Sequence, residues 1–316
     1  MLQSLIRWRS PAGPRARLST LIFHRVLSQA DPLFPHEVHA QRFDQICGWI
    51  ARWFNVLPLD QAARRLAEGS LPERAAAITF DDGYADNAEV ALPILQRHGL
   101  CATFFVATGF LNGGRMWNDS LIESVRRCPG DGLDLGDTPA QALGRLPLTT
   151  IAQRREAALR LIGAAKYLSQ PERAQWVEAV ARRSGATLPD DLMMRDDQLL
   201  RLRDAGMQIG GHTVTHPILA RLQLDEVRRE IAQGRDDLQR LLGQPVRLFA
   251  YPNGKPSEDY QTQAVDIVRE LGFDAAVTTA WGAAGTGSDL FQLPRFTPWD
   301  RARVRFGLRL AWQLTK

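Results

Sequence analysis

Residues 75–84 read AAAITFDDGY, an apolar run that ends in two adjacent carboxylates and a glycine turn. The run predicts a buried β-strand, and the residues after it show helical spacing, with Asp86 as a cap and Pro93 as a kink. Asp-Gly also closes hairpins, but a hairpin needs a second strand directly afterwards. We therefore expect Asp81 and Asp82 in a βα loop, the place where α/β barrels keep functional groups.

The same alternation of strand and helix continues along much of the chain. Apolar segments that predict strands lie at 19–24, 76–80, 101–106, 207–211, 246–250, 274–279 and 290–293. Helical patterns separate them at 40–53, 60–68, 86–98, 223–242 and 260–272. This order predicts an α/β fold with a mostly parallel barrel. A length of 316 residues suits a single domain of that kind, spanning 1–316.

Residues 112–200 break this rhythm. Two helical patterns lie within the span, at 153–162 and 171–177, and a stretch rich in aspartate and glycine at 131–139 precedes them. We interpret the span as a helical insertion between barrel strands, with 131–139 as its flexible entry.

A second apolar segment ends in histidines, because residues 208–217 read QIGGHTVTHP. His212 and His216 are four positions apart, so in one helical turn both imidazoles face the same way. Two solvated loop histidines are the simpler alternative. A carboxylate from Asp82 would complete a set of two histidines and one carboxylate, which favours zinc and leaves nickel, cobalt or manganese open. Asp81 would then be left to act as a base.

The TFDDGY block at 79–84 and the His212-x-x-x-His216 block resemble the first two motifs of the polysaccharide deacetylase family. This is the NodB-homology group, carbohydrate esterase family four. The resemblance implies a distorted barrel of seven to eight mostly parallel strands. It also implies an enzyme in which a metal-activated water attacks an N-acetyl group, with Asp82, His212 and His216 as metal ligands and Asp81 as base.

The third motif of that family is matched in part by residues 247–254, RLFAYPNG. Aligned on Pro252, the chain has Asn253 where the family has tyrosine and Ala250 where it has arginine. The resemblance implies that the main-chain N–H of Asn253 holds the oxyanion, and it makes Tyr251 and Pro252 candidate substrate-binding residues.

An arginine orients the catalytic base in this family, and Ala250 cannot do so. Arg295 follows the apolar segment 290–293 and is the first candidate by position. Arg247 opens an apolar strand and is the second candidate, assigned to the substrate-binding set. For each, an ordinary solvated charge is the alternative.

The general acid is the remaining role. No histidine follows His216, so the usual C-terminal Leu-x-His motif of the family is absent. Residues 21–26, LIFHRV, instead place His24 at the end of a strand. This resembles the branch of poly-N-acetylglucosamine deacetylases, in which an N-terminal histidine sits in the active site. His24 is therefore the candidate acid, and a structural core histidine is the alternative.

Two aromatic features are ambiguous. Trp281 would serve as a sugar platform or as a core side chain. Residues 299–316 mix basic and aromatic side chains, which suits peripheral contact with an anionic bilayer. The alternative is a helix that packs Phe306, Leu310 and Leu314 on the barrel. The net charge of +4 is too small to indicate nucleic acid.

The sequence also bears on location. Residues 1–9 lack the apolar run of a signal peptide, and no segment is apolar enough to span a membrane. Three cysteines, Cys47, Cys101 and Cys128, show no metal-ligand spacing. We expect a cytoplasmic protein, with peripheral contact at the inner face of the membrane as an option, and no protein partner is evident.

Taken together, the residues and the resemblance favour a metal-dependent deacetylase of an N-acetylated glycan or a lipid-linked sugar. Alternatives are an O-deacetylase or deformylase acting on a sugar, a metal-dependent amidase of a small amide, and an inactive glycan-binding barrel. Retention of Asp81 disfavours the last, because a binding protein needs no base beside its metal ligands.

Overall fold

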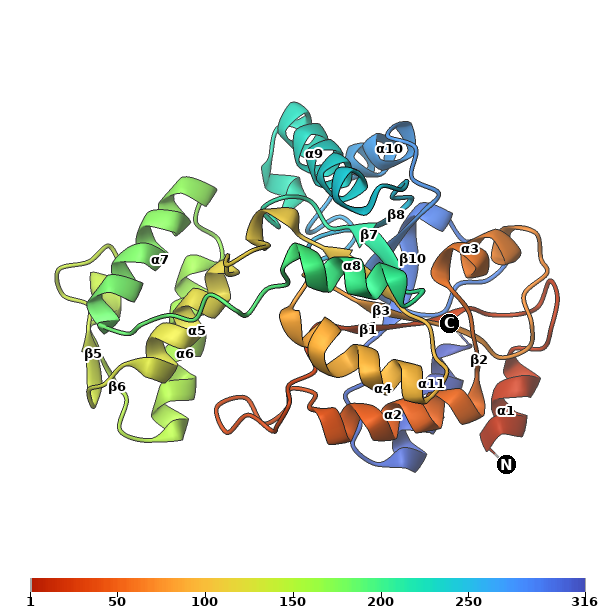
Figure 1. Ribbon diagram of the computed structural model, residues 1–316, viewed down its shortest axis with the longest axis horizontal. Helices are drawn as coiled ribbons and strands as arrows, with labels where there is room; N and C mark the ends of the chain where they lie inside the picture. Colours follow the sequence, from red (N-terminus) through yellow and green to blue (C-terminus); the bar gives the residue numbers. More distant parts are fainter. Residues whose placement is uncertain (1, 316) are drawn as a thin grey trace. The chain divides into compact units, whose positions relative to one another are not determined.

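Parallel strands close into a barrel in the computed structural model, which describes residues 2–315 (Figure 1). Hydrogen bonding runs around seven strands and returns from the last to the first. In barrel order they are β1 (Ser19–Phe23), β10 (Leu293–Phe296), β9 (Ala275–Trp281), β8 (Leu248–Ala250), β7 (Gln208–Gly211), β4 (Thr103–Val106) and β3 (Ala75–Phe80). The short strand β2 (Asn55–Val56) adds to β3. The predicted α/β barrel of parallel strands is confirmed.

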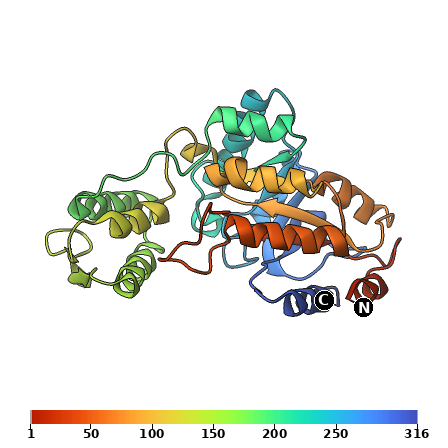
Figure 2. The same cartoon turned by 60° about the horizontal axis from the view of Figure 1, so that its bottom comes forward.

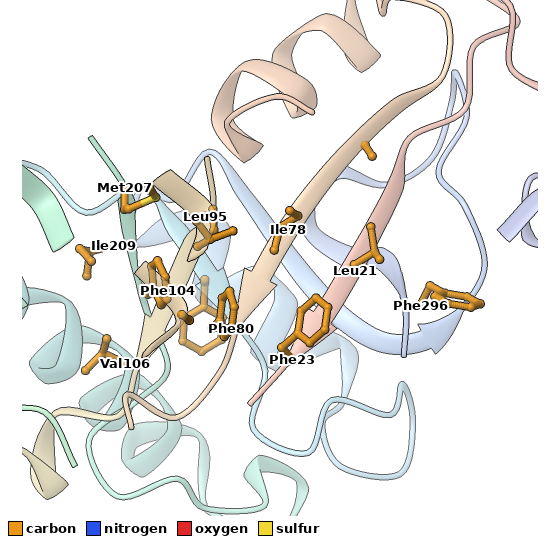
Figure 3. Packing of buried hydrophobic residues seen from close by; sticks show 14 of the residues in the cluster. Leu21, Phe23, Ile78, Phe80, Leu95, Phe104, Val106, Met207, Ile209 and Phe296 are labelled. Carbon is orange, nitrogen blue, oxygen red and sulfur yellow. The ribbon is translucent and has the colours of Figure 1, made fainter. Parts of the chain in front are cut away.

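Side chains of β3 alternate between two apolar clusters. Ile78 and Phe80 belong to the cluster that includes the surrounding helices, whereas Ala75 and Ala77 belong to the other. Such alternation is expected when both faces of a strand are covered. On the helix side, Phe80 stacks on Phe104 with ring centroids 4.7 Å apart and on Phe23 at 5.3 Å (Figure 3). This packing fixes the register of the strands that carry the candidate site.

Helices follow most of the strands. They are α2 (Ala40–Trp53), α3 (Leu59–Ala67), α4 (Leu92–Arg97), α8 (Asp196–Asp204), α9 (Leu224–Leu242) and α10 (Thr262–Glu270). Short 3-10 turns lie at Thr108–Phe110, Gln141–Leu143, Leu219–Arg221 and Leu290–Gln292. The last of these corrects the strand expected at 290–293, because β10 begins only at Leu293.

The helix expected at 86–98 is irregular at its start. Asn87–Ala91 is π-helical, and α4 begins at Leu92 with Pro93 in its first turn, where the missing N–H does least harm. Asp86 does not cap this helix with its side chain. Its carboxylate instead accepts hydrogen bonds from the segment after β1.

Residues 30–37 and 112–193 form a second compact unit with its own core. It contains α5 (Trp117–Arg127), α6 (Ile151–Ala165), α7 (Gln170–Ser184) and a two-stranded hairpin of β5 (Gly132–Asp134) and β6 (Arg145–Pro147). The expected flexible entry at 131–139 thus includes a strand. The expected insertion at 112–200 differs at its end, because residues from 194 onward belong to the barrel unit.

The terminal helices α1 (Leu2–Arg9) and α11 (Arg303–Gln313) lie side by side (Figure 2). α11 buries Phe306, Leu310 and Leu314, as the packed-helix interpretation requires. Gln313 ties it to the barrel, since Ser19 Oγ donates to Gln313 Oε1 at 2.9 Å. Lys316, the last residue of the basic segment, lies outside the described residues. Among residues 2–315, no helix has the length and apolarity that crossing a bilayer requires.

Candidate active site

The two candidate carboxylates lie directly after β3. Because β1 and β3 are parallel with Phe23 opposite Phe80, the segments that follow them leave the sheet together, and the Asp81 N–H donates to the Phe23 carbonyl at 2.9 Å. The backbone then turns sharply, with φ of +79° at Asp82 and +92° at Gly83. A Cβ on Gly83 would lie 3.0 Å from Val106 Cγ1. The turn therefore requires glycine and separates the two carboxylates.

Asp81 is held by a buried arginine from β10. Arg295 Nη1 and Nη2 each donate to one carboxylate oxygen of Asp81 at 2.7 Å. The guanidinium also donates to the Thr278 carbonyl at 2.7 Å and to Thr79 Oγ1 at 3.2 Å. Burial raises the pKa of Asp81, but the charge of Arg295 outweighs it, so this pKa lies below its usual range. Asp81 is consequently an oriented carboxylate.

Asp82 faces the two histidines of the loop after β7. Its Oδ1 lies 3.4 Å from His212 Nε2 and 3.5 Å from His216 Nε2, and one ligand atom from each residue lies within 4.8 Å of the others. Within the described chain, this buried Oδ1 has no hydrogen-bond partner. His212 Nδ1 lies 2.7 Å from the Ala250 carbonyl, which it can only contact as a donor, so Nε2 of the neutral ring carries the lone pair. These residues fit a divalent metal ion, with Ala250 orienting a ligand.

The charges at this triad favour a cation. Burial raises the pKa of Asp82, but the neighbouring rings of His212 and His216 outweigh burial and lower this pKa below its usual range. Burial lowers the pKa of His216 to about 4, so this imidazole is neutral at pH 7. Burial also lowers the pKa of His212, yet Asp82 and Asp81 outweigh it and raise that pKa. A metal ion at this point experiences the same attraction to the carboxylates.

The loop between the two histidines is pinned by α9. Glu230 Oε2 accepts from the N–H groups of Val214 and Thr215 at 2.9 Å each, and Glu230 Oε1 accepts from Thr215 Oγ1 at 2.7 Å. The helix comes close because Gly234 has no side chain. A Cβ there would lie 2.8 Å from the backbone of Thr213. The helix thus fixes the position of the loop that carries His212 and His216.

His24 is exposed at the end of β1, which excludes the alternative of a core histidine. Its carbonyl accepts from Asn87 Nδ2 at 2.9 Å. Next to it, Asp86 accepts from Arg25 Nε at 2.8 Å and from the Val26 N–H at 3.0 Å. Because Phe23 lies opposite Phe80 in the parallel β1–β3 pair, His24 follows its strand at the same edge as Asp81 and Asp82.

The Tyr251-Pro252-Asn253 segment follows β8. The Tyr251 ring is buried and stacks on Tyr260 at 3.9 Å, and its hydroxyl donates to the Phe291 carbonyl at 3.0 Å. The expected substrate contact is therefore not open to the Tyr251 side chain, and Pro252 is buried too. Asn253 is exposed with φ of +59°, and its N–H donates no hydrogen bond to residues 2–315. That N–H is the donor this segment presents.

Two other candidates, Arg247 and Trp281, have side-chain partners outside the triad. Arg247 precedes β8, at the end of the strand opposite Asn253, and its exposed guanidinium lies 3.8 Å from the Asp274 carboxylate. It is therefore not placed to orient Asp81 or to contact a substrate at the triad. Trp281 packs against Trp312 of α11 with ring centroids 4.7 Å apart. On β9 it also lies opposite Arg295 of β10, the arginine that pairs with Asp81.

Sequence reasoning missed several supporting residues. Thr79 lies in the quoted TFDDGY block, two positions before Asp81, and strand alternation would have placed both side chains on one face. Thr278, Glu230 and Asn87 gave no comparable signal. Their hydrogen bonds depend on how strands, loops and helices pack against one another, which the local pattern does not show.

Comparison with known proteins agrees with this geometry. The family model described as polysaccharide deacetylase matches residues 68–137 and 172–276, more than half of the chain. The chain is 20% identical over 282 residues to YxkH of Bacillus subtilis, whose name places it among the polysaccharide deacetylases, covering 89% of this chain and 71% of that protein.

Two solved structures share the fold. IcaB from Ammonifex degensii has a TM-score of 0.61 at 19% identity, with 96% of this chain and 98% of that chain covered. The Streptococcus pyogenes deacetylase PplD, solved in complex with acetate, has a TM-score of 0.59 at 20% identity, with 89% and 92% covered.

Proposed function

Because the chain belongs to the polysaccharide deacetylase family of carbohydrate hydrolases, we propose that it is a metal-dependent enzyme that removes N-acetyl groups from amino sugars of a polysaccharide or a lipid-linked glycan precursor. One observation carries the proposal. Adjacent buried carboxylates have different partners: Asp82 Oδ1 has no hydrogen bond and faces two imidazole Nε2 atoms, whereas Asp81 is paired with Arg295.

Asp82, His212 and His216 would hold the ion, and their donor set favours zinc over nickel, cobalt or manganese. Such an ion, when bound, polarises an acyl oxygen and lowers the pKa of a water molecule. Every other role falls to residues of this chain.

Asp81 takes the proton from the attacking water, since Arg295 keeps it ionised and fixes its orientation. The Asn253 N–H donates to the acyl oxygen as that oxygen gains negative charge. His24, exposed at the same edge as both carboxylates, gives a proton to the departing nitrogen. The acyl group leaves as acetate, and the sugar keeps a free amine.

The test is metal content together with acetate release from N-acetylglucosamine oligomers, for the wild type, Asp81→Asn and Asp82→Asn. Asp82→Asn should lose both metal and turnover. Asp81→Asn should retain metal and lose turnover by about 10²–10⁴-fold. Full metal occupancy in Asp82→Asn would refute the ligand assignment, and an active Asp81→Asn would refute the base.

The same assay distinguishes N-deacetylation from the alternative activities on acylated sugars. Release of acetate only from O-acetylated sugars would identify an O-deacetylase, and release of formate from N-formyl sugars would identify a deformylase. The Asp81–Arg295 pair argues against a glycan-binding protein without turnover, because binding alone gives no reason to keep a buried, oriented carboxylate next to the metal ligands.

A further inference from the structure

The terminal helices expose apolar side chains that a folded domain would normally bury or omit. On α11, Val304, Leu308 and Trp312 are four residues apart and lie on one side of the helix. Val304 is 68% exposed and Leu308 is 51% exposed, and Trp312 continues the stripe onto Trp281. We call these four residues the terminal-helix face. Exposed apolar patches of this kind mark interaction sites.

Further tryptophans flank this face. Trp8 is exposed on the neighbouring helix α1, and Trp299 is exposed in the segment that leads into α11. Tryptophan is favoured at the boundary between water and lipid, because its ring is apolar and its N–H is polar.

The two terminal helices carry basic side chains and no acidic ones, and the acidic partner of Arg7 is Glu73, 2.7 Å away on another segment. No aspartate or glutamate occurs in residues 2–30 or 301–315, whereas α1 carries Arg7 and Arg9 and α11 carries Arg303, Arg305 and Arg309. Asp300, just before α11, is buried and paired with Arg305 and Arg309. Basic and aromatic side chains therefore share a surface without exposed acidic groups on its two helices.

We propose that the terminal-helix face docks on an anionic lipid bilayer. The apolar side chains enter the boundary between headgroups and acyl chains, while the arginines extend along the surface and meet lipid phosphates. Because no helix in the described part of the chain is long and apolar enough to span a bilayer, the contact is peripheral. This inference concerns a different surface from the proposed active site and goes beyond the proposed function.

Within the face, Val304 and Leu308 are exposed on α11, whereas Phe306 and Leu310 of the same helix are buried against the barrel. Gln313, at the end of α11, bonds to Ser19 at the start of β1, whereas His24 follows the other end of that strand. A five-residue strand separates these points, which is about 17 Å at the usual rise per residue. Because Val304 and Leu308 are exposed and neither belongs to the proposed active site, their substitution should leave catalysis of a soluble substrate unchanged.

The experiment is co-sedimentation of the full chain with vesicles of phosphatidylcholine alone and of phosphatidylcholine mixed with phosphatidylglycerol. The test variant is Val304→Ser/Leu308→Ser. The matched control is Ile151→Ser/Leu159→Ser, which removes side chains that are 52% and 55% exposed on α6 of the second unit. Acetate release from soluble oligomers is measured for all three proteins, so that loss of docking is distinguished from loss of activity or folding.

We expect binding to the mixed vesicles, weaker binding to neutral ones, and release by high salt. The test variant should bind at least about tenfold more weakly, with unchanged acetate release, and the control variant should bind like the wild type. Failure of the wild type to bind, or equal loss in both variants, overturns the proposal. So does a dimer that Val304→Ser/Leu308→Ser dissociates, or binding of duplex DNA without binding of vesicles.

Discussion

Asp81 and Asp82 are neighbouring buried carboxylates, yet their surroundings differ. We call the surroundings of each the Asp81 side and the Asp82 side of the site. Asp81 meets a guanidinium with matched donors for both oxygens, whereas Asp82 meets two imidazole nitrogens and keeps one oxygen without a hydrogen bond. A buried carboxylate needs a compensating cation. Arg295 supplies that cation for Asp81, and the proposed metal ion would supply it for Asp82.

The strongest challenge to this comparison is Arg295→Met, which leaves Asp81 buried without its cation. Turnover should fall by about 10²–10⁴-fold, and the free energy of unfolding should drop by about 3–5 kcal/mol. Since the main group that lowers the pKa of Asp81 is then gone while burial still raises it, the acidic limb of the kcat/KM profile should move to higher pH. Steady-state kinetics across pH and urea titration measure both effects.

Arg247→Met is the matched control for that variant, because its guanidinium is exposed at the other end of β8. It should leave the rate and its pH profile unchanged. In addition, Asp81→Asn/Arg295→Met should be more stable than Arg295→Met alone, because the unpaired charge is gone. An Arg295→Met enzyme with a normal acidic limb would show that Asp81 does not depend on this partner.

Glu230→Ala tests the Asp82 side. It removes the acceptor of the Val214 and Thr215 N–H groups and leaves the proposed metal ligands in place. Metal affinity should fall by about 10–100-fold, the usual effect of losing a partner that supports metal ligands. Competition with a chelator measures this, and Asp225→Ala on the exposed start of α9 is the control. Unchanged affinity would mean that the loop holds its shape without α9.

A third prediction concerns proton binding in the metal-free protein. The pKa of His216, about 4 when folded, is below its usual value near 6.5, so the unfolded chain takes up this proton first. The contribution of the neutral His216 ring to the free energy of unfolding is therefore lost as pH falls from about 6.5 to about 4. At pH 5 the loss is about 2 kcal/mol. The raised pKa of His212 acts with the opposite sign, since its contribution is present at low pH and is lost as pH rises.

Urea titration at pH 7 and pH 5 in the presence of chelator tests this difference. His216→Ala should lose less stability on acidification than the wild type, and His212→Ala should lose more. Identical pH dependence in all three proteins would contradict the assigned environments.

The smallest effect is expected from Asn87→Ala, which removes the donor to the His24 carbonyl. Because only the position of the candidate acid changes, kcat should fall about fivefold, while metal content and the acidic limb stay the same. Glu89→Ala, on the exposed side of the same turn, is the control. Loss of metal in Asn87→Ala would show that metal binding depends on the segment that positions His24, contrary to the separate roles assigned here.

Local pattern was sufficient to predict the barrel and the positions of Asp81, Asp82, His212 and His216 in loops after β3 and β7. These residues follow apolar strands, and parallel strands bring their carboxyl ends to one edge. The π-helical turn at Asn87–Ala91 and the hairpin in the second unit were not predicted, because three-residue strands and a single wide turn leave no periodic signal.

It was harder to predict which arginine pairs with Asp81. Arg295 and Arg247 both lie near apolar segments, and only the order of strands around the barrel shows that β10, through β1, brings Arg295 to β3. The motif resemblance made Tyr251 a candidate substrate-binding residue, and it gave no sign that the ring would be buried against Tyr260. Long-range contacts of this kind depend on closure of the barrel and not on residues close in the sequence.

The position of Arg295 on the last strand has a consequence for how the enzyme is made. During synthesis Asp81 emerges 214 residues before its guanidinium partner, and β1 gains its second neighbour only when β10 arrives. A nascent barrel therefore holds an uncompensated acid at its centre until the final strand docks. A chain that ends before residue 293 should be readily cut by proteases, so completeness and catalytic competence would be acquired in the same folding step.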